Sequence, residues 1–191
     1  MTFVDGQIRS RKDPAQAISL IEAMRRGGLA AIEEKVSTRP APTEMKYSRY
    51  THSAVFAEVK IDPDLGLIRV TRVVSALAVG RILNPKTARS QVLGAIVGGI
   101  GTALEEESVI DHSLGRFMTH NLADYHVPVN ADVGNIEVIF VEEQDKVVNP
   151  LGAKGLGEIG IVGVAAAIAN AVFHATGKRI RDLPITLDKL L

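Results

Sequence analysis

The chain has 191 residues, of which 46% are hydrophobic, so it can bury a real core and form one domain or two small lobes. Lys plus Arg and Asp plus Glu number 22 each, which makes the formal net charge zero. This balance provides no basic surface for nucleic acid or for an anionic membrane. Aromatic residues are scarce and tryptophan is absent, which also argues against a surface on which bases stack.

Cysteine is absent, which excludes disulfides, zinc–thiolate sites and iron–sulfur clusters ligated within this chain. The five histidines lack the HxxxH and HExxH spacings, so we expect no metal held by side chains alone. The two longest apolar stretches, Val92–Leu104 and Ile159–Phe173, are shorter than the roughly 20 residues that a bilayer span needs. Met1–Ser10 has no apolar signal-peptide core. We expect a soluble, cytoplasmic chain, or a periplasmic one if a partner chain carries an export signal.

The first 45 residues predict one helix and a connecting segment. Asp13 followed by Pro14 is typical of an N-cap and a first helical position, and Gly27 is typical of a helix end. The range Val36–Tyr47 contains two prolines, and we expect it to be an exposed connection.

Residues 46–191 predict a sheet built around a hairpin. Val55–Ile61 alternates between apolar and polar side chains, Asp62–Gly66 has strong turn chemistry, and Leu67–Val74 returns as a second β-branched run. Ile136–Val141 is an apolar run between acidic neighbours and predicts a further strand.

Two helices are expected to cover this sheet. Asn84–Glu107 begins with an Asn-Pro cap and contains the glycine-rich stretch Gly94–Gly101, whose glycine density indicates close approach to another surface. The second helix is expected from about Gly160 to Ala175, with Gly177 as its C-terminal stop. Strands and helices mix without a regular βαβ rhythm, which favours the α+β class.

A glycine-rich loop before the second helix carries the most informative residues. Four glycines in the range Gly152–Gly160 surround Lys154 and Glu158, and glycine lets another group come near the main chain. The unpaired amides of the following helix favour the ionised form of Glu158, whereas an apolar pocket would raise its pKa toward that of a general base. The residues alone leave both a helix-capping glutamate and a general base open.

Gly155, Gly157 and Gly160 also fit GxGxxG, the dinucleotide-binding pattern. The nearest expected strand ends near Val141, however, and the dinucleotide fold requires a strand that leads straight into the glycines. Asp182 lies at a suitable distance downstream, but the residues before it are too polar for a second core strand. Nucleotide binding is therefore the weaker alternative.

Five motifs follow one another in an order typical of a single enzyme family: Gly80–Pro85, Gln91–Glu106, Asn121–Pro128, Gly152–Ala171 and Arg181–Thr186. They resemble the carboxy-terminal segment of the large, molybdopterin-binding subunit of xanthine dehydrogenase/aldehyde oxidase-type molybdenum hydroxylases. The likeness is strong from Lys46 to Leu191 and looser before it.

The resemblance implies a molybdenum–molybdopterin cofactor, with Glu158 as the catalytic base that deprotonates a metal-bound hydroxide. A fixed carboxylate beside a metal-activated hydroxide is general-base catalysis. The resemblance also implies that Gln91 hydrogen-bonds the pterin and that Lys154, Gly155 and Gly157 face the cofactor. The resemblance leaves purine, aldehyde, carbon monoxide and N-heterocycle oxidation open, and we expect an aldehyde or an N-heterocycle as the substrate. The implied partners are the remainder of the large subunit and the subunits that carry iron–sulfur clusters and FAD.

Large subunits of this family are several times longer than this chain, and most of their cofactor contacts lie upstream of the matching segment. The isolated chain is therefore expected to be inactive, and to work only when joined to the missing part. The alternative is a truncated or split gene product that is catalytically inactive and acts at most as an assembly module.

Overall fold

A computed structural model of the chain describes residues 1–37 and 46–190. The chain divides into two compact units, Met1–Arg39 and Pro40–Leu191. Composition had predicted one domain or two small lobes. Each unit has its own sheet and at least one helix. Most of the expected connection Val36–Tyr47 lies outside the described residues.

The N-terminal unit contains a small antiparallel sheet of order β1-β2-β3 and one short helix. Its elements are β1 (Thr2–Val4), β2 (Gln7–Arg9), β3 (Ala17–Ser19) and α1 (Leu20–Arg26). The predicted helix start after Asp13 is wrong, because residues 17–19 pair with β2 and the hydroxyl of Ser19 caps the helix by accepting from the Glu22 amide at 3.1 Å. The predicted end at Gly27 is confirmed.

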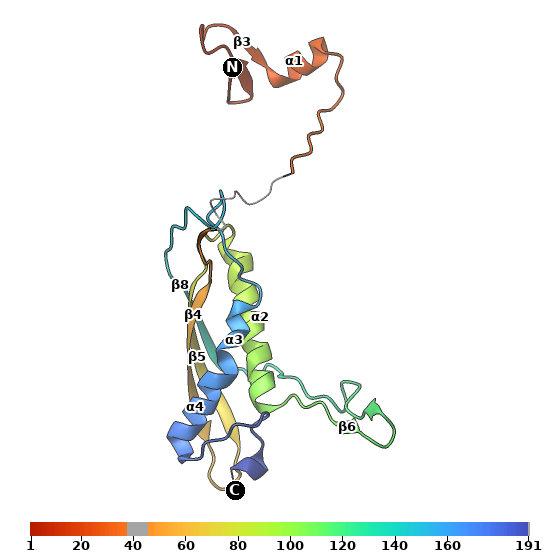
Figure 1. The fold of residues 1–191 in the computed structure, drawn as a ribbon, viewed down its shortest axis with the longest axis vertical. Helices are drawn as coiled ribbons and strands as arrows, with labels where there is room; N and C mark the ends of the chain where they lie inside the picture. The colour runs from red at the N-terminus through yellow and green to blue at the C-terminus, as the bar shows by residue number, and fades with distance from the viewer. Residues whose placement is uncertain (38–45, 191) are drawn as a thin grey trace. The chain divides into compact units, whose positions relative to one another are not determined.

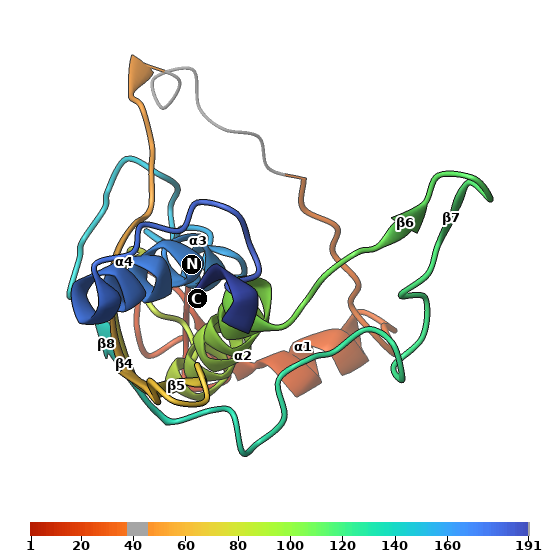
Figure 2. The ribbon, with the colours of Figure 1, turned by 90° about the horizontal axis from the view of Figure 1, so that it is seen from below.

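The larger unit is a three-stranded sheet covered on one face by helices (Figures 1 and 2). Its main elements are β4 (His52–Ile61), β5 (Ile68–Ala78), α2 (Pro85–Leu104), β8 (Asn135–Phe140), α3 (Ile159–Val162) and α4 (Val164–Thr176). The shorter elements are β6 (Ile110–Asp111), β7 (Arg116–Phe117) and the 3-10 helix η2 (Leu187–Lys189). The predicted α+β class is confirmed.

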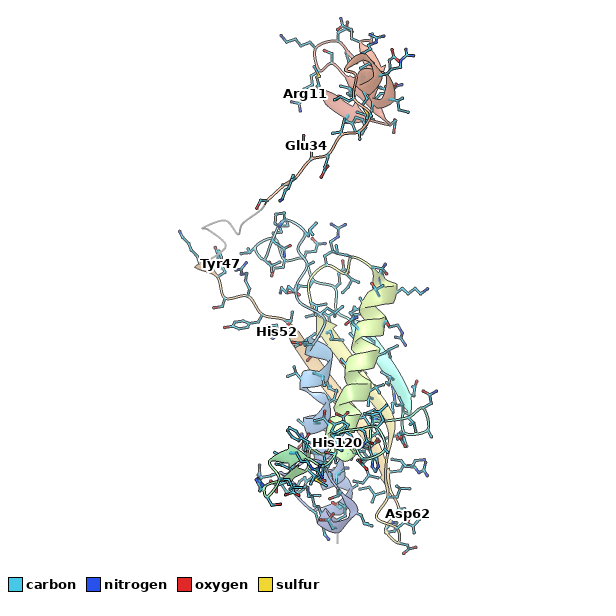
Figure 3. All side chains as sticks on the ribbon, turned by 90° about the vertical axis from the view of Figure 1, so that its right-hand side faces the viewer. Arg11, Glu34, Tyr47, His52, Asp62 and His120 are labelled. Carbon is cyan, nitrogen blue, oxygen red and sulfur yellow. The ribbon has the colours of Figure 1, made fainter. Side chains whose placement is uncertain are left out.

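The predicted hairpin is formed by β4 and β5, which pair antiparallel, while β8 pairs in parallel with β5. Asp62 lies at the hairpin turn, at the opposite end of β4 from His52 (Figure 3). The Asp62 carboxylate accepts hydrogen bonds from the amides of Asp64 and Leu65, both at 3.0 Å, which closes the turn. The strand alternation then places one set of side chains toward the helices.

One core lies between the sheet and the helices. It consists of Val70, Val73, Leu77, Val79, Val92, Ile96, Ile100, Ala103, Val164, Ile168, Val172 and Ile185. The α2 and α4 members recur every four residues or nearly so, and therefore share one face of each helix. Burial of these apolar side chains is the main force that holds the helices on the sheet.

Glycines let the helices approach one another closely. A Cβ atom added at Gly99 of α2 would lie 2.5 Å from Cβ of Val164, so the predicted close approach is confirmed there. The predicted second helix is interrupted at Gly163, which separates α3 from α4. A Cβ atom at Gly163 would lie 2.9 Å from a methyl carbon of Val55, so the break sits against β4.

Of the described residues, only the helical run Ile159–Thr176 is long and apolar enough to suit a membrane-crossing helix. Gly163 interrupts this run, and Val164, Ile168 and Val172 are completely buried within the core. Of this run, 22% is buried, and the buried residues of α4 are those that pack in the core over the sheet.

We expect Gly99→Ala to lower the free energy of unfolding of the chain by about 1–3 kcal/mol, because the added methyl group overlaps Val164. Gly94→Ala is the matched control on the same helix, since no atom lies within 4 Å of an added Cβ. The control should stabilise the chain by roughly 0.5–1 kcal/mol through helix propensity. Urea unfolding followed by circular dichroism measures both, and equal effects would contradict this packing.

Candidate functional site

The predicted glycine loop folds back against the chain that leaves β5. The Arg81 amide donates to the carbonyl oxygen of Gly152 at 2.8 Å, and the Lys154 amide donates to that of Val79 at 3.0 Å. Because this part of the chain continues into the N-cap Asn84, the loop is held beside the start of α2.

The crossing of these two segments requires glycine. Gly80 has φ +69°, and a Cβ atom there would overlap the carbonyl oxygen of Gly152, which itself has φ +70°. Any other residue at position 80 would be strained in its backbone and would push the loop away. Sequence reasoning recognised Gly80 only as part of a motif.

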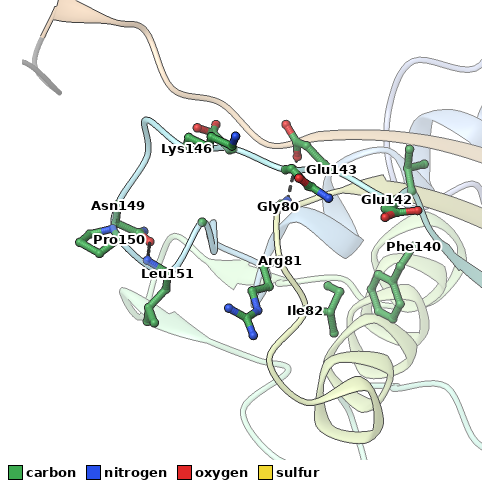
Figure 4. A pocket seen from close by; sticks show the side chains of 14 residues that line it. Gly80, Arg81, Ile82, Phe140, Glu142, Glu143, Lys146, Asn149, Pro150 and Leu151 are labelled. Atoms are coloured by element: carbon green, nitrogen blue, oxygen red, sulfur yellow. Dashed lines mark hydrogen bonds between the residues drawn. The ribbon is translucent and has the colours of Figure 1, made fainter. Parts of the chain in front are cut away.

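Asn149 organises the turn that begins the loop (Figure 4). Its side-chain oxygen accepts from the Leu151 amide at 3.0 Å, and its side-chain nitrogen donates to the Ala153 carbonyl oxygen at 2.7 Å. Such side chain to backbone bonds are how asparagine fixes turns. Sequence reasoning assigned no role to this residue.

Gln91 and Lys154 line the same cavity, which has a volume of about 400 Å³ and lies between the start of α2 and the loop. Its other walls include the apolar side chains of Val79, Ile82 and Leu156. The carboxamide of Gln91 is exposed and makes no hydrogen bond to any described residue. The structure therefore brings together two of the predicted cofactor-facing residues.

Glu158 occupies the N-cap position of α3, but its side chain makes no capping hydrogen bond. The carboxylate is exposed and forms no ion pair with the part of the chain that the structure describes. A Cβ atom at Gly155 or Gly157 would meet nothing within 4 Å, so open space adjoins the backbone at both glycines. These three residues do not line the cavity of Gln91 but lie on the same loop, next to Lys154 and Leu156.

The dinucleotide-binding alternative receives no support from this geometry. The preceding strand β8 ends at Phe140, well before Gly155, and the helix that follows the glycines has only four residues. A dinucleotide site needs a strand that runs directly into the glycine turn and a helix whose amides face the phosphates.

A charged cluster that the sequence did not reveal lies at the base of the loop. The Lys154 ammonium is 2.5 Å from Oε1 of Glu143 and 3.1 Å from Oδ2 of Asp145. The Lys154 side chain is only 9% exposed. Glu143 also accepts a hydrogen bond from the Gly80 amide at 2.8 Å (Figure 4), which ties the cluster to the end of β5.

These contacts shift the pKa of all three groups. The hydrogen bond from Lys154 lowers the pKa of Glu143. The amides of Val147 and Val148, and then Lys154, lower the pKa of Asp145. The hydrogen bond to Glu143 raises the pKa of Lys154 against the opposing effect of its burial. The two carboxylates therefore contribute stability that is lost only when the pH falls through their lowered pKa. Lys154 contributes stability that is lost only when the pH rises through its raised pKa. All three groups are ionised at neutral pH.

Comparison with known proteins identifies the family. A family model for the molybdopterin cofactor-binding domain matches residues 1–134. The aldehyde oxidoreductase molybdenum-binding subunit PaoC of Escherichia coli K12 is 48% identical over 189 residues, which cover 99% of this chain and 25% of that protein. The xanthine dehydrogenase molybdenum-binding subunit of Escherichia coli O157:H7 is 37% identical over 165 residues, or 86% of this chain and 21% of that protein.

A solved structure agrees over nearly the whole chain. The crystal structure of the Cu,Mo-CO dehydrogenase superposes with a TM-score of 0.77 and 21% identity, covering 99% of this chain and 24% of that one. The chain thus spans about a quarter of the length of the relatives it matches. It belongs to the molybdopterin cofactor-binding domain family, as a segment of a molybdenum-binding subunit of the xanthine dehydrogenase/aldehyde oxidoreductase type.

Proposed function

We propose that this chain supplies the general base, and part of the cofactor-facing surface, of a molybdenum hydroxylase that oxidises an aldehyde or an N-heterocycle. The observation that carries the proposal is the Glu158 carboxylate, which stands at a helix start without capping it and without an ion pair to any described residue. Ser, Thr, Asp and Asn are the residues that cap helix starts, so capping does not explain a glutamate at this position. The names of the relatives, an aldehyde oxidoreductase subunit and a xanthine dehydrogenase subunit, support the substrate class.

The residues near Glu158 suit a molybdopterin cofactor. The Gln91 carboxamide offers both a donor and acceptors at the rim of a cavity, and a pterin ring carries both kinds of group. The open backbone at Gly155 and Gly157 leaves room for a large ligand to approach the main chain. Lys154 belongs to the same surface through its backbone and its alkyl chain, since its ammonium is held by carboxylates.

When bound, the molybdenum cofactor supplies the activated oxygen nucleophile and accepts the electrons removed from the substrate. Glu158 takes up the proton of the attacking group at a carboxylate oxygen, which is general-base catalysis. The Glu158 carbonyl oxygen accepts from the Ile161 amide at 3.1 Å, which fixes its backbone. Gln91 orients the cofactor from the adjacent helix α2.

The complete enzyme needs other chains or chain segments. We propose the remainder of the molybdenum-binding subunit as the first partner, because the segment covers a quarter of the related subunit. Iron–sulfur clusters need cysteine ligands, which this chain lacks, so separate iron–sulfur and FAD subunits would carry the electrons away. We place the assembled enzyme in the cytoplasm, or in the periplasm if a partner is exported.

In the complete enzyme, we expect Glu158→Gln to reduce kcat by about 10²–10⁴-fold with an unchanged molybdenum content, because the amide keeps the shape but cannot accept the proton. Steady-state kinetics and metal analysis of the purified enzyme measure the two quantities. Glu34→Gln, at an exposed glutamate of the N-terminal unit, is the matched control and should retain full turnover. Near-normal turnover of Glu158→Gln with a lowered Tm would show that Glu158 is structural.

Purified alone, the chain is expected to contain no molybdenum, because one glutamine and a glycine loop offer too few contacts for a large dithiolene cofactor. Co-expression with the remainder of the subunit should restore both the metal and turnover. Mass spectrometry measures the metal content of both samples, and steady-state kinetics measure their turnover. Stoichiometric molybdenum in the lone chain would contradict the first, and a co-expressed complex that binds molybdenum without turnover would favour the inactive assembly module.

A further inference from the structure

We propose that Lys154 is a positioning residue: with Glu143 and Asp145 it fixes the loop that carries Glu158, and so it acts on catalysis through Glu158. We call this group of three side chains the lysine clasp. The inference rests on the proposed function of Glu158 as a base. It assigns Lys154 a role different from the cofactor contact that the family resemblance implies.

The lysine clasp joins three separate segments of the chain. Glu143 and Asp145 belong to the segment after β8, and Lys154 belongs to the loop. The Gly80 amide bonded to Glu143 lies two residues after β5. The backbone bond between Lys154 and Val79 runs alongside these contacts. A change at the ammonium therefore affects the position of the loop relative to the sheet.

The loop between the lysine clasp and α3 has one apolar contact of its own, because Leu156 packs against the core. Open space adjoins Gly155 and Gly157 on either side of Leu156, so polar contacts at the two ends of the loop complete its attachment. The clasp holds the first end, and the second is Gly160, which is buried against α2 with an added Cβ only 2.9 Å from that of Ala95. Glu158 lies between the two anchors, four residues after Lys154.

The ammonium has little capacity left for a ligand. Two of its three hydrogens point to the carboxylates of Glu143 and Asp145, and the side chain is mostly buried. Removing the charge would leave two carboxylates close together without a cation between them. Their repulsion would push the segment after β8 away from the loop.

Hydrogen–deuterium exchange on the 191-residue chain tests the anchor without any cofactor. We expect Lys154→Met to speed exchange at the amides of Gly80, Arg81 and Lys154 about tenfold, because their protection depends on the closed loop. Lys154→Arg should keep most of the protection, and α2 should not change. Arg72→Met removes an exposed ion pair with Glu137 on the sheet and is the matched control.

If Lys154→Met fails to fold, Glu143→Gln gives the same test, because it removes one charge and keeps the side-chain shape. Protection equal to that of the unmodified chain in whichever of the two variants folds would overturn the inference. Loss of protection across the whole sheet, and not only at the loop, would overturn it as well.

The second arm measures turnover per bound molybdenum in the complete enzyme. Lys154→Met should lower kcat roughly 10²-fold with KM nearly unchanged, because displacement of Glu158 affects the chemical step and not substrate binding. Lys154→Arg should retain most of the kcat. A lower Tm with unchanged kcat per molybdenum would reduce Lys154 to a structural residue and overturn the inference. If Glu158→Gln is inactive while Lys154→Met keeps kcat, the inference alone fails. If Glu158→Gln is fully active, the proposed function fails and the inference fails with it.

Discussion

The close packing of α2 is the constraint on which the rest of the larger unit depends. Its apolar face fills the core over the sheet, and Gly99 lets α4 approach to contact distance at Val164. The same helix carries Gln91 at the cavity and packs against Gly160, the residue that anchors the end of the glycine loop. Because interiors are close-packed, a shift of α2 would move both functional segments together.

Part of the candidate site is fixed by hydrogen bonds, and part of it adjoins open space. The segments around Gly80 and Asn149 are fixed by backbone and side-chain hydrogen bonds, whereas open space adjoins Gly155 and Gly157 and the Glu158 side chain is exposed. An exposed carboxylate on a fixed loop costs little free energy in this chain, since water solvates it. For the proposed role of Glu158, a ligand and further protein surface would have to adjoin this carboxylate. This arrangement suits a segment that spans a quarter of the related subunits.

Local signals in the sequence predicted most of the fold, and non-local contacts account for what they missed. The hairpin, the cap at Asn84 and the stop at Gly177 follow from alternation, side-chain capping and left-handed backbone, all of which act over a few residues. The break at Gly163 depends on contact with β4, about 110 residues earlier, which no local pattern reveals. The roles proposed for Gln91 and Glu158 come from the family resemblance. No sequence pattern predicted the partners of Lys154, because an ion pair between two loops produces no periodic pattern.

The two carboxylates of the lysine clasp do different things for the loop. Two acidic side chains hold Lys154, so the group as a whole carries one net negative charge, where a lone lysine would carry a positive one. Glu143 also accepts from the Gly80 amide, so it joins the ammonium to the chain that leaves β5. Asp145 accepts from the amides of Val147 and Val148, so it joins the same ammonium to the turn that begins the loop. A single carboxylate partner would neutralise the ammonium but would tie the loop to only one of these two segments.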